Sequence, residues 1–214
     1  MSIRAHLIRL RRMTMITANL AVSLDGFAAG PGQDLDHPFG VGAEALTAWM
    51  FETEQPGREA DKKILADIHA GIGAHIMGRN MFGPGRGPWD LGWNGWWGTE
   101  PPYHAPTFVL THYEREPVTM EGGTTFTFVT EGIEAALVQA HEAADGKDVG
   151  IAGGAATIRQ YLAAGLLDEL VLHVVPVVLG AGENLFTGLS GIELRPMETT
   201  ASHTVAHVRY RVRH

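Results

Sequence analysis

The amino-acid sequence predicts an α/β fold whose central sheet is mixed, with an antiparallel edge near the C-terminus and helices on both faces. Strand-like and helix-like periodicities alternate along the chain. An apolar strand at residues 149–152 runs through two glycines into a helix at residues 155–164. The last two strands, 169–179 and 202–212, have no helix between them, which favours antiparallel pairing.

The individual elements follow from the spacing of apolar residues. Residues 16–24 alternate apolar and polar side chains, which is typical of a half-buried strand. Residues 169–179 are rich in Val and Leu and indicate a buried central strand. The remaining predicted strands are residues 74–78, 107–111 and 125–130, and the remaining helices are residues 43–51, 59–70 and 133–144. Residues 83–106 hold several tryptophans among glycines and prolines and are expected to be irregular.

Composition excludes several function classes. Sixteen Lys and Arg stand against 24 Asp and Glu, a net charge of −8, and no stretch concentrates basic residues as a nucleic-acid-binding surface requires. The absence of cysteine excludes disulfides, thiolate metal sites and a cysteine nucleophile. No apolar run approaches the roughly 20 residues of a membrane-spanning helix. We therefore expect a cytoplasmic protein that binds neither nucleic acid nor membrane.

Residues 15–214 are predicted to form one domain, because neither a linker nor an internal repeat interrupts them. Residues 1–14 carry four arginines but neither an apolar core nor a small-residue cleavage site. We expect a flexible leader there rather than a signal peptide.

The strongest local signal is the strand, glycine pair and helix of residues 149–157. Glycine lets backbone amides approach phosphate oxygens closely, and a helix start offers unpaired N–H groups with partial positive charge. A diphosphate would therefore contact the backbone of this turn and the hydroxyl group of Thr157. The residues concerned are Gly153, Gly154, Ala155, Ala156 and Thr157. The alternative is a tight strand-to-helix turn without a ligand.

Two further strand ends offer nucleotide-binding groups. Gly78, Arg79 and Asn80 follow one strand, and an arginine there can fork onto the 2′-phosphate of NADPH. Thr111 and His112 follow another, where a hydroxyl and a ring could hold adenosine. The alternatives are a surface salt bridge for the arginine and an ordinary strand terminus for the second pair. One dinucleotide can use these groups together with the glycine pair only if all lie at one end of the sheet.

Motif order and sequence point to a known family. A Rossmann fold places its glycine-rich turn after the first strand, whereas here Ser-Leu-Asp-Gly ends that strand at residues 23–26 and the glycine pair comes far later. Met-Gly-Arg at 77–79 and the run 151–186 (Gly-Gly, a short helix, Leu-Asp-Glu-Leu, Gly-Ala-Gly, Leu-Phe) complete the pattern. The chain from residue 15 onward resembles the dihydrofolate reductase-like family, in the branch that contains the riboflavin-biosynthesis reductase domain.

The resemblance implies a three-layer fold and an NADPH-dependent oxidoreductase acting on a small pyrimidine- or pterin-like heterocycle. It implies cofactor contacts at the positions already named. Two departures leave the substrate open: Phe27 stands where the riboflavin-pathway reductases usually have Lys, and no carboxylate matches the one that holds the pterin in dihydrofolate reductases. Glu44, Glu52, Glu54 and Glu59 do not fit that local pattern.

Two carboxylates are candidates for the proton transfer that accompanies hydride transfer. Asp25 follows the first strand, and Glu183 lies in the loop that the family resemblance implies to be near the nicotinamide and substrate. The alternatives are an Asp25 that only caps its turn and a Glu183 that is a solvated loop charge.

The tryptophan-rich segment has two interpretations. Its rings could form a lid that stacks on a flat substrate. Alternatively, they could pack against a second subunit, since we expect the protein to be a homodimer. The rings proposed for the substrate are Trp89, Trp93, Trp97 and Tyr103.

No metal is expected, because His203 and His207 would lie about 13 Å apart on one face of a strand. Two other functions stay open: a nucleotide-binding protein without turnover, and a flavin- or deazaflavin-using oxidoreductase of the same fold.

Overall fold

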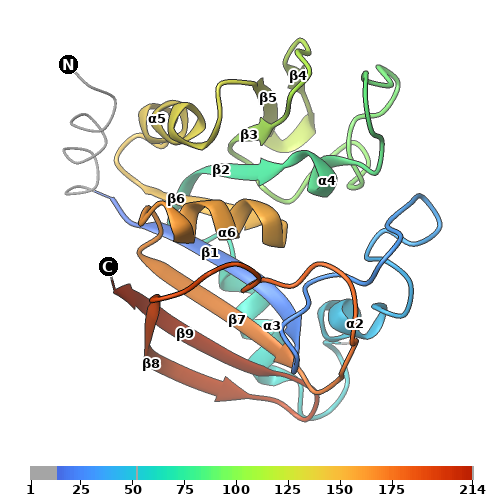
Figure 1. Cartoon of the computed structure of the whole chain (residues 1–214), viewed down its shortest axis with the longest axis vertical. Helices are drawn as coiled ribbons and strands as arrows, with labels where there is room; N and C mark the ends of the chain where they lie inside the picture. The colour runs from blue at the N-terminus through green and yellow to red at the C-terminus, as the bar shows by residue number, and fades with distance from the viewer. Residues whose placement is uncertain (1–13, 52, 214) are drawn as a thin grey trace.

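The computed structural model describes residues 14–51 and 53–213, which form one nine-stranded sheet with helices on both faces (Figure 1). The strands are β1 (Ile16–Ser23), β2 (Ile72–Gly78), β3 (Pro106–Leu110), β4 (Val118–Thr119), β5 (Thr125–Val129), β6 (Asp148–Gly153), β7 (Glu169–Val175), β8 (Glu193–Ala201) and β9 (Ala206–Arg213). The helices are α2 (Ala45–Phe51), α3 (Glu59–Asp67), α4 (Arg79–Phe82), α5 (Ile133–Ala143) and α6 (Ala155–Ala163), with a 3₁₀ turn at Glu121–Gly123. Apart from Thr14, the leader predicted for residues 1–14 lies outside the described residues.

The strand order is β4-β5-β3-β2-β6-β1-β7-β9-β8. The strands from β5 to β7 pair in parallel, whereas β4 at one edge and β9 and β8 at the other pair antiparallel. The predicted mixed sheet with an antiparallel C-terminal edge is therefore confirmed. Strand β1 is central, between β6 and β7, and its residues are buried or half-buried without the alternation predicted for residues 16–24.

Two apolar layers cover the sheet. On one face, α5 and α6 pack on the strands through a core that includes Leu137, Ile158 and Ile76. On the other face, α2 contributes Leu46 and Trp49 to a second core together with Val175 of β7. Because successive strand residues point to opposite faces, Leu172 and Val175 of β7 join different cores. Within the described residues, no helix is long and apolar enough to cross a membrane.

Two strands and one α-helix were not predicted, and the largest boundary errors concern the end of β7 and the start of β9. Strand β8 is mostly exposed and contains Pro196, so it lacks the apolar alternation of a half-buried strand. Strand β4 has two residues and α4 has four, too few for a periodic signal. The predicted strand 169–179 ends at Val175, because its continuation becomes a loop. The predicted strand 202–212 begins at Ala206, because the preceding residues form the turn from β8.

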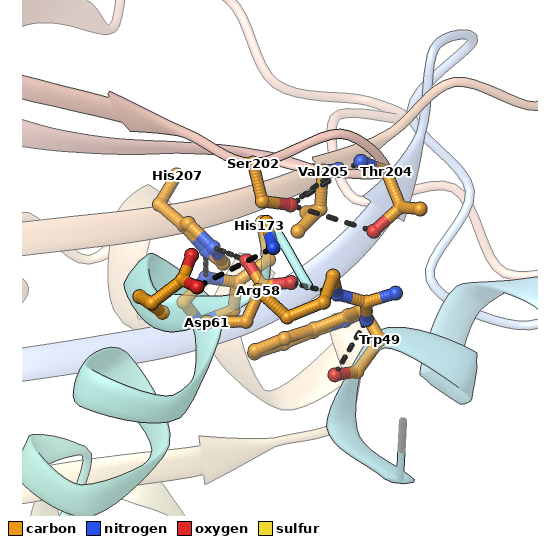
Figure 2. A network of polar contacts seen from close by, with 10 residues as sticks. Trp49, Arg58, Asp61, His173, Ser202, Thr204, Val205 and His207 are labelled. Carbon is orange, nitrogen blue, oxygen red and sulfur yellow. Dashed lines mark hydrogen bonds and ion pairs between the residues drawn. The ribbon is translucent and has the colours of Figure 1, made fainter. Parts of the chain in front are cut away.

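A buried polar network ties α3 to the sheet (Figure 2). Asp61 of α3 is fully buried and accepts hydrogen bonds from Arg58 Nε and from His207 Nε2 of β9, the latter at 2.8 Å. His207 and His173 of β7 approach through their Nδ1 atoms at 2.7 Å. Since His207 donates Nε2–H to the carboxylate, His173 must donate its Nδ1–H to His207 when both rings are neutral. Burial opposes ionisation of Asp61, but hydrogen bonds from His207, Ser202 and Arg58 outweigh it and lower its pKa.

Acid is expected to destabilise the protein through His173. Burial, reinforced by His207, lowers the pKa of His173 from 6.5 to about 3. Between pH 6.5 and about 3, His173 is therefore protonated in the unfolded chain but stays neutral in the folded protein. The free energy of unfolding falls as pH drops through this interval, by up to about 1.4 kcal/mol per pH unit. Urea unfolding at pH 7 and pH 5 measures the loss.

The matched variant is His173→Asn, which keeps a polar atom near the Nδ1 position but does not titrate. Its stability should depend less on pH than that of the parent protein across this interval. An equal loss in both proteins would show that His173 is not the responsible group.

Candidate active site

The predicted nucleotide-binding residues meet at one edge of the sheet. Strands β3, β2, β6 and β1 are parallel neighbours, so their carboxyl ends lie together. In register, Gly78 lies opposite Leu110, and Met77 lies opposite Gly153. The segments that begin at Arg79, Thr111 and Gly154 therefore leave the same edge, as one dinucleotide requires.

This edge also contains a change in winding direction. From β2 the chain moves to β3, whereas from β6 it moves through α6 to β7 on the other side of β1. The connections that leave the neighbouring strands β2 and β6 therefore run apart. In α/β sheets such a point forms a crevice at the carboxyl ends of the strands, where ligands bind.

The glycine pair forms an open helix start. Gly153 has φ +125, the Gly153–Gly154 peptide is cis, and Gly154 is the N-cap of α6 without a side-chain cap. The N–H of Thr157 bonds to the carbonyl of Gly154 at 3.0 Å, which leaves the N–H groups of Ala155 and Ala156 at the helix start for a ligand. A Cβ built on Gly154 would meet nothing within 4 Å, whereas one on Gly78 would lie 2.4 Å from Thr157 Oγ1. The turn thus has free space on one side and close packing on the other.

Arg79 is held by stacking rather than by a carboxylate. Its guanidinium lies 3.8 Å from the ring centroid of Trp89 and 5.2 Å from that of Tyr113, and its Nε donates to the carbonyl of Gly85. Burial lowers its pKa, and Nη1 is buried with no hydrogen-bond partner among the described residues. The surface salt bridge considered for Arg79 is absent from the described part of the chain.

The other predicted cofactor residues differ in exposure. Asn80 and His112 are exposed at the ends of β2 and β3. Thr111 is buried, and its Oγ1 accepts the N–H of Tyr113 at 3.1 Å. Thr111 therefore shapes the turn that carries Tyr113 over Arg79.

A cavity of about 420 Å³ opens between the loops that follow β1, α4 and β7. It is lined by the segment 30–33, by Arg86, and by Gly182 and Glu183. A second hollow of about 300 Å³, lined by residues 33–36 with Pro84 and Gly85, shares Gln33 with the first. Arg86 was not predicted, because a single cation in an irregular segment carries no sequence signal. Glu183 was predicted, and the structure places it in the lining of the same cavity as that cation.

Asp25 is engaged as a hydrogen-bond acceptor on both carboxylate oxygens. Oδ1 accepts Ser23 Oγ–H at 2.6 Å and the N–H of Leu179 at 3.1 Å, and Oδ2 accepts the N–H of Gly180 at 2.7 Å. The bond from Ser23, with those from Gly180 and Leu179, lowers the pKa of Asp25. A proton donor has to be protonated before it acts, so this geometry favours the turn-capping alternative over catalysis.

Glu183 keeps its carboxylate accessible. Its side chain is 47% exposed and lies 4.0 Å from Arg159 of α6. Its backbone is fixed, because its N–H donates to Ala29 and its carbonyl accepts from Ala28, both at 2.9 Å. A carboxylate on a fixed backbone at a cavity wall can accept hydrogen bonds from a ligand, so Glu183 is the better placed of the two predicted acids.

The tryptophan-rich segment packs on its own domain. Trp89 Nε1 donates to Tyr113 at 2.8 Å, Trp93 Nε1 donates to Phe82 at 2.9 Å, and Trp97 stacks on Phe126. These three tryptophans are half-buried, so their roles as a lid or an interface stay predictions.

Tyr103 differs from the tryptophans. It is 5% exposed, and its ring is enclosed by His69, His75 and Trp97. In this arrangement it offers no ring face to a substrate. Within the described residues, no group of three His, Asp or Glu side chains is placed to hold a metal ion.

Comparisons with known proteins agree with this architecture. The uncharacterized protein YwjB of Bacillus subtilis (strain 168) is 36% identical over 176 residues, which cover 80% of this chain and 82% of that protein. The structure of a pyrimidine reductase-like protein from Corynebacterium diphtheriae has a TM-score of 0.56 at 16% identity, with 94% of this chain and 92% of the other covered. Dihydrofolate reductase from Enterococcus faecalis, complexed with NADP(H), has a TM-score of 0.53 at 16% identity, with 94% and 97% covered.

The two solved structures show that the fold is dihydrofolate reductase-like, as the sequence predicted. The family model described as the RibD C-terminal domain matches residues 14–208, nearly the whole described chain. With this match and the 36% identical relative, the protein belongs to the RibD C-terminal domain family.

Proposed function

We propose that this protein is an NADPH-dependent reductase that transfers hydride to a small pyrimidine- or pterin-like heterocycle. The observation that carries the proposal is the meeting of the open glycine turn, Arg79 and Thr111 on adjacent parallel strands. The cavity that holds Glu183 lies at the same edge. Membership in a family that includes reductases of riboflavin biosynthesis, and a fold shared with a dihydrofolate reductase, support an oxidoreductase.

The residues at the edge fit a dinucleotide phosphate. The space beside Gly154 admits phosphate oxygens next to the N–H groups of Ala155 and Ala156. Arg79, stacked on Trp89, presents its remaining donors to a 2′-phosphate, while Thr111 and His112 border the adenosine. NADPH supplies the hydride. Glu183 accepts a hydrogen bond from an N–H edge of the heterocycle, and Arg86 in the same cavity lining attracts negative charge on the substrate.

A nucleotide titration tests the cofactor. NADPH should quench tryptophan fluorescence, because Trp89 contacts Arg79 in the proposed site. It should also bind more tightly than NADH, because Arg79 is proposed to bind the 2′-phosphate that only NADPH carries. Arg79→Ala should weaken NADPH binding by about 10- to 100-fold, the worth of charge-assisted hydrogen bonds at about 1.5–3 kcal/mol, and leave NADH binding almost unchanged. Arg213→Ala, at the end of β9 and far from β2 and β3 in the strand order, is the control. Equal affinity for both nucleotides would contradict the role of Arg79.

A nucleotide-binding protein without turnover is the second candidate, because the carboxylate of Asp25 is already engaged. Aminopyrimidine and dihydropterin substrates should oxidise bound NADPH if the protein is a reductase. Tight NADPH binding without turnover of any such substrate would favour the binding protein.

A further inference from the structure

The loop after β7 forms a wall of the cavity and is fastened to the segment after β1. We call residues 176–186 the wall loop; it carries Gly182 and Glu183. Two backbone hydrogen bonds hold it: the N–H of Leu24 donates to the carbonyl of Val177 at 2.8 Å, and the N–H of Leu185 donates to the carbonyl of Gly26 at 2.9 Å. Between these two hydrogen bonds the wall loop turns at Gly180, which has φ +73.

The carboxylate of Asp25 holds this turn. It accepts hydrogen bonds from the N–H groups of Leu179 and Gly180, which lie between the two backbone hydrogen bonds. Ser23 Oγ–H donates to the same carboxylate and accepts the N–H of Phe27, so the carboxylate itself is fixed in place. Three donors converge on two oxygens, an arrangement that favours the ionised, acceptor-only form of the carboxylate.

The same residue connects the wall loop to the glycine turn. Asn184 Nδ2 donates to the carbonyl of Asp25 at 2.9 Å, and Arg159 of α6 donates to the carbonyl of Asn184. Arg159 also faces Glu183. Glu183 is thus placed by contacts from two directions: the Asp25 segment and the helix that begins at Gly154.

We propose that Asp25 is a positioning residue that holds the wall loop, and through it Glu183, in the geometry that receives the heterocyclic substrate. The inference rests on the proposed function for the identity of the ligand, but the fixing of the wall loop is tested without it. Asp25 exchanges no proton with the substrate and touches it nowhere. Its effect on substrate binding runs through the position of Glu183.

The test variant is Asp25→Asn. An amide has one acceptor oxygen, and its NH₂ group would face an N–H of Leu179 or Gly180, so one bond is lost and a donor meets a donor. The control is Asp148→Asn, because Asp148 also accepts a backbone N–H, that of Met15 at 2.8 Å, but at the first residue of β6, on the opposite edge of the sheet. Both variants remove one carboxylate that bonds to backbone.

Hydrogen exchange provides the first readout. The amides of Leu179 and Gly180 should exchange at least about tenfold faster in Asp25→Asn than in the parent protein, and at the parent rate in Asp148→Asn. Unchanged exchange in Asp25→Asn would overturn the proposal whatever the protein catalyses.

Kinetics with NADPH and an aminopyrimidine or dihydropterin provide the second readout. Asp25→Asn should raise KM about tenfold or more, with kcat, its pH profile and the Kd for NADPH unchanged. Loss of one limb of the pH profile would make Asp25 a proton donor and overturn the positioning role. If the parent protein binds no nucleotide, the proposed function fails, while the exchange result still decides whether Asp25 fixes the wall loop.

Discussion

Asp61→Ala is expected to lower the free energy of unfolding by about 3–5 kcal/mol. The change removes the carboxylate that faces the buried guanidinium of Arg58 and that accepts the Nε2–H of His207. A buried charge that loses its counter-ion pays its full desolvation penalty, which is why breaking such pairs is costly. Denaturant unfolding at pH 7 measures the effect.

The control for this prediction is Asp67→Ala in the same helix. Asp67 is exposed at the end of α3, so its removal should change stability by less than about 0.5 kcal/mol. A loss below about 1 kcal/mol for Asp61→Ala would mean that the network does not anchor α3 to β7 and β9. In that case the packing of Leu46, Trp49 and Val175 alone would hold this layer.

Gly154→Asp is expected to weaken NADPH binding on the order of 100-fold while the protein stays folded. Aspartate is a favoured N-cap, and a Cβ at this position meets nothing within 4 Å, so the helix start should tolerate it. Its carboxylate would lie where the diphosphate is proposed to bind, and the like charges would repel. Isothermal titration with NADPH measures the affinity, and a thermal melt verifies the fold.

Gly154→Asn is the matched control, because asparagine has the shape of aspartate without its charge. It should lose less affinity than the aspartate variant, and the difference between the two isolates the charge. If Gly154→Asp bound NADPH as tightly as the parent protein, the glycine pair would be a tight turn with no ligand. The nucleotide site would then have to lie elsewhere.

The central part of the fold was predictable because local periodicity encodes it. The apolar run in β7 reflects burial on both faces, and this prediction is confirmed. Strand β1 is confirmed as a strand, but the half-buried alternation predicted for it is wrong, because β1 is central and its burial does not alternate. The edge strand β8 escaped prediction because solvent covers most of its side chains, so nothing imposes an apolar pattern. Strand β4 was missed because its two residues are too few for a periodic signal.

The candidate site was predictable where a motif coincides with a strand end. Arg79, Thr111 and Gly154 each follow a strand, and parallel pairing then brings them to one edge. Arg86 and the cavity were not predictable, because they arise where two irregular loops approach each other. Asp25 was identified as important by its place after β1, but its partners could not be read from its neighbours in sequence.

The sequence by itself determined the α/β class, the mixed sheet and the family pattern from residue 23 to residue 186, because periodicity and short motifs are local properties. The tertiary structure alone decided which distant residues meet. Asp25 binds the N–H of Gly180, 155 residues later, and Asp61 binds His207, 146 residues later. Such pairs depend on strand order and register, which bring together side chains that are distant in the sequence. The local sequence around one residue therefore does not indicate its partner.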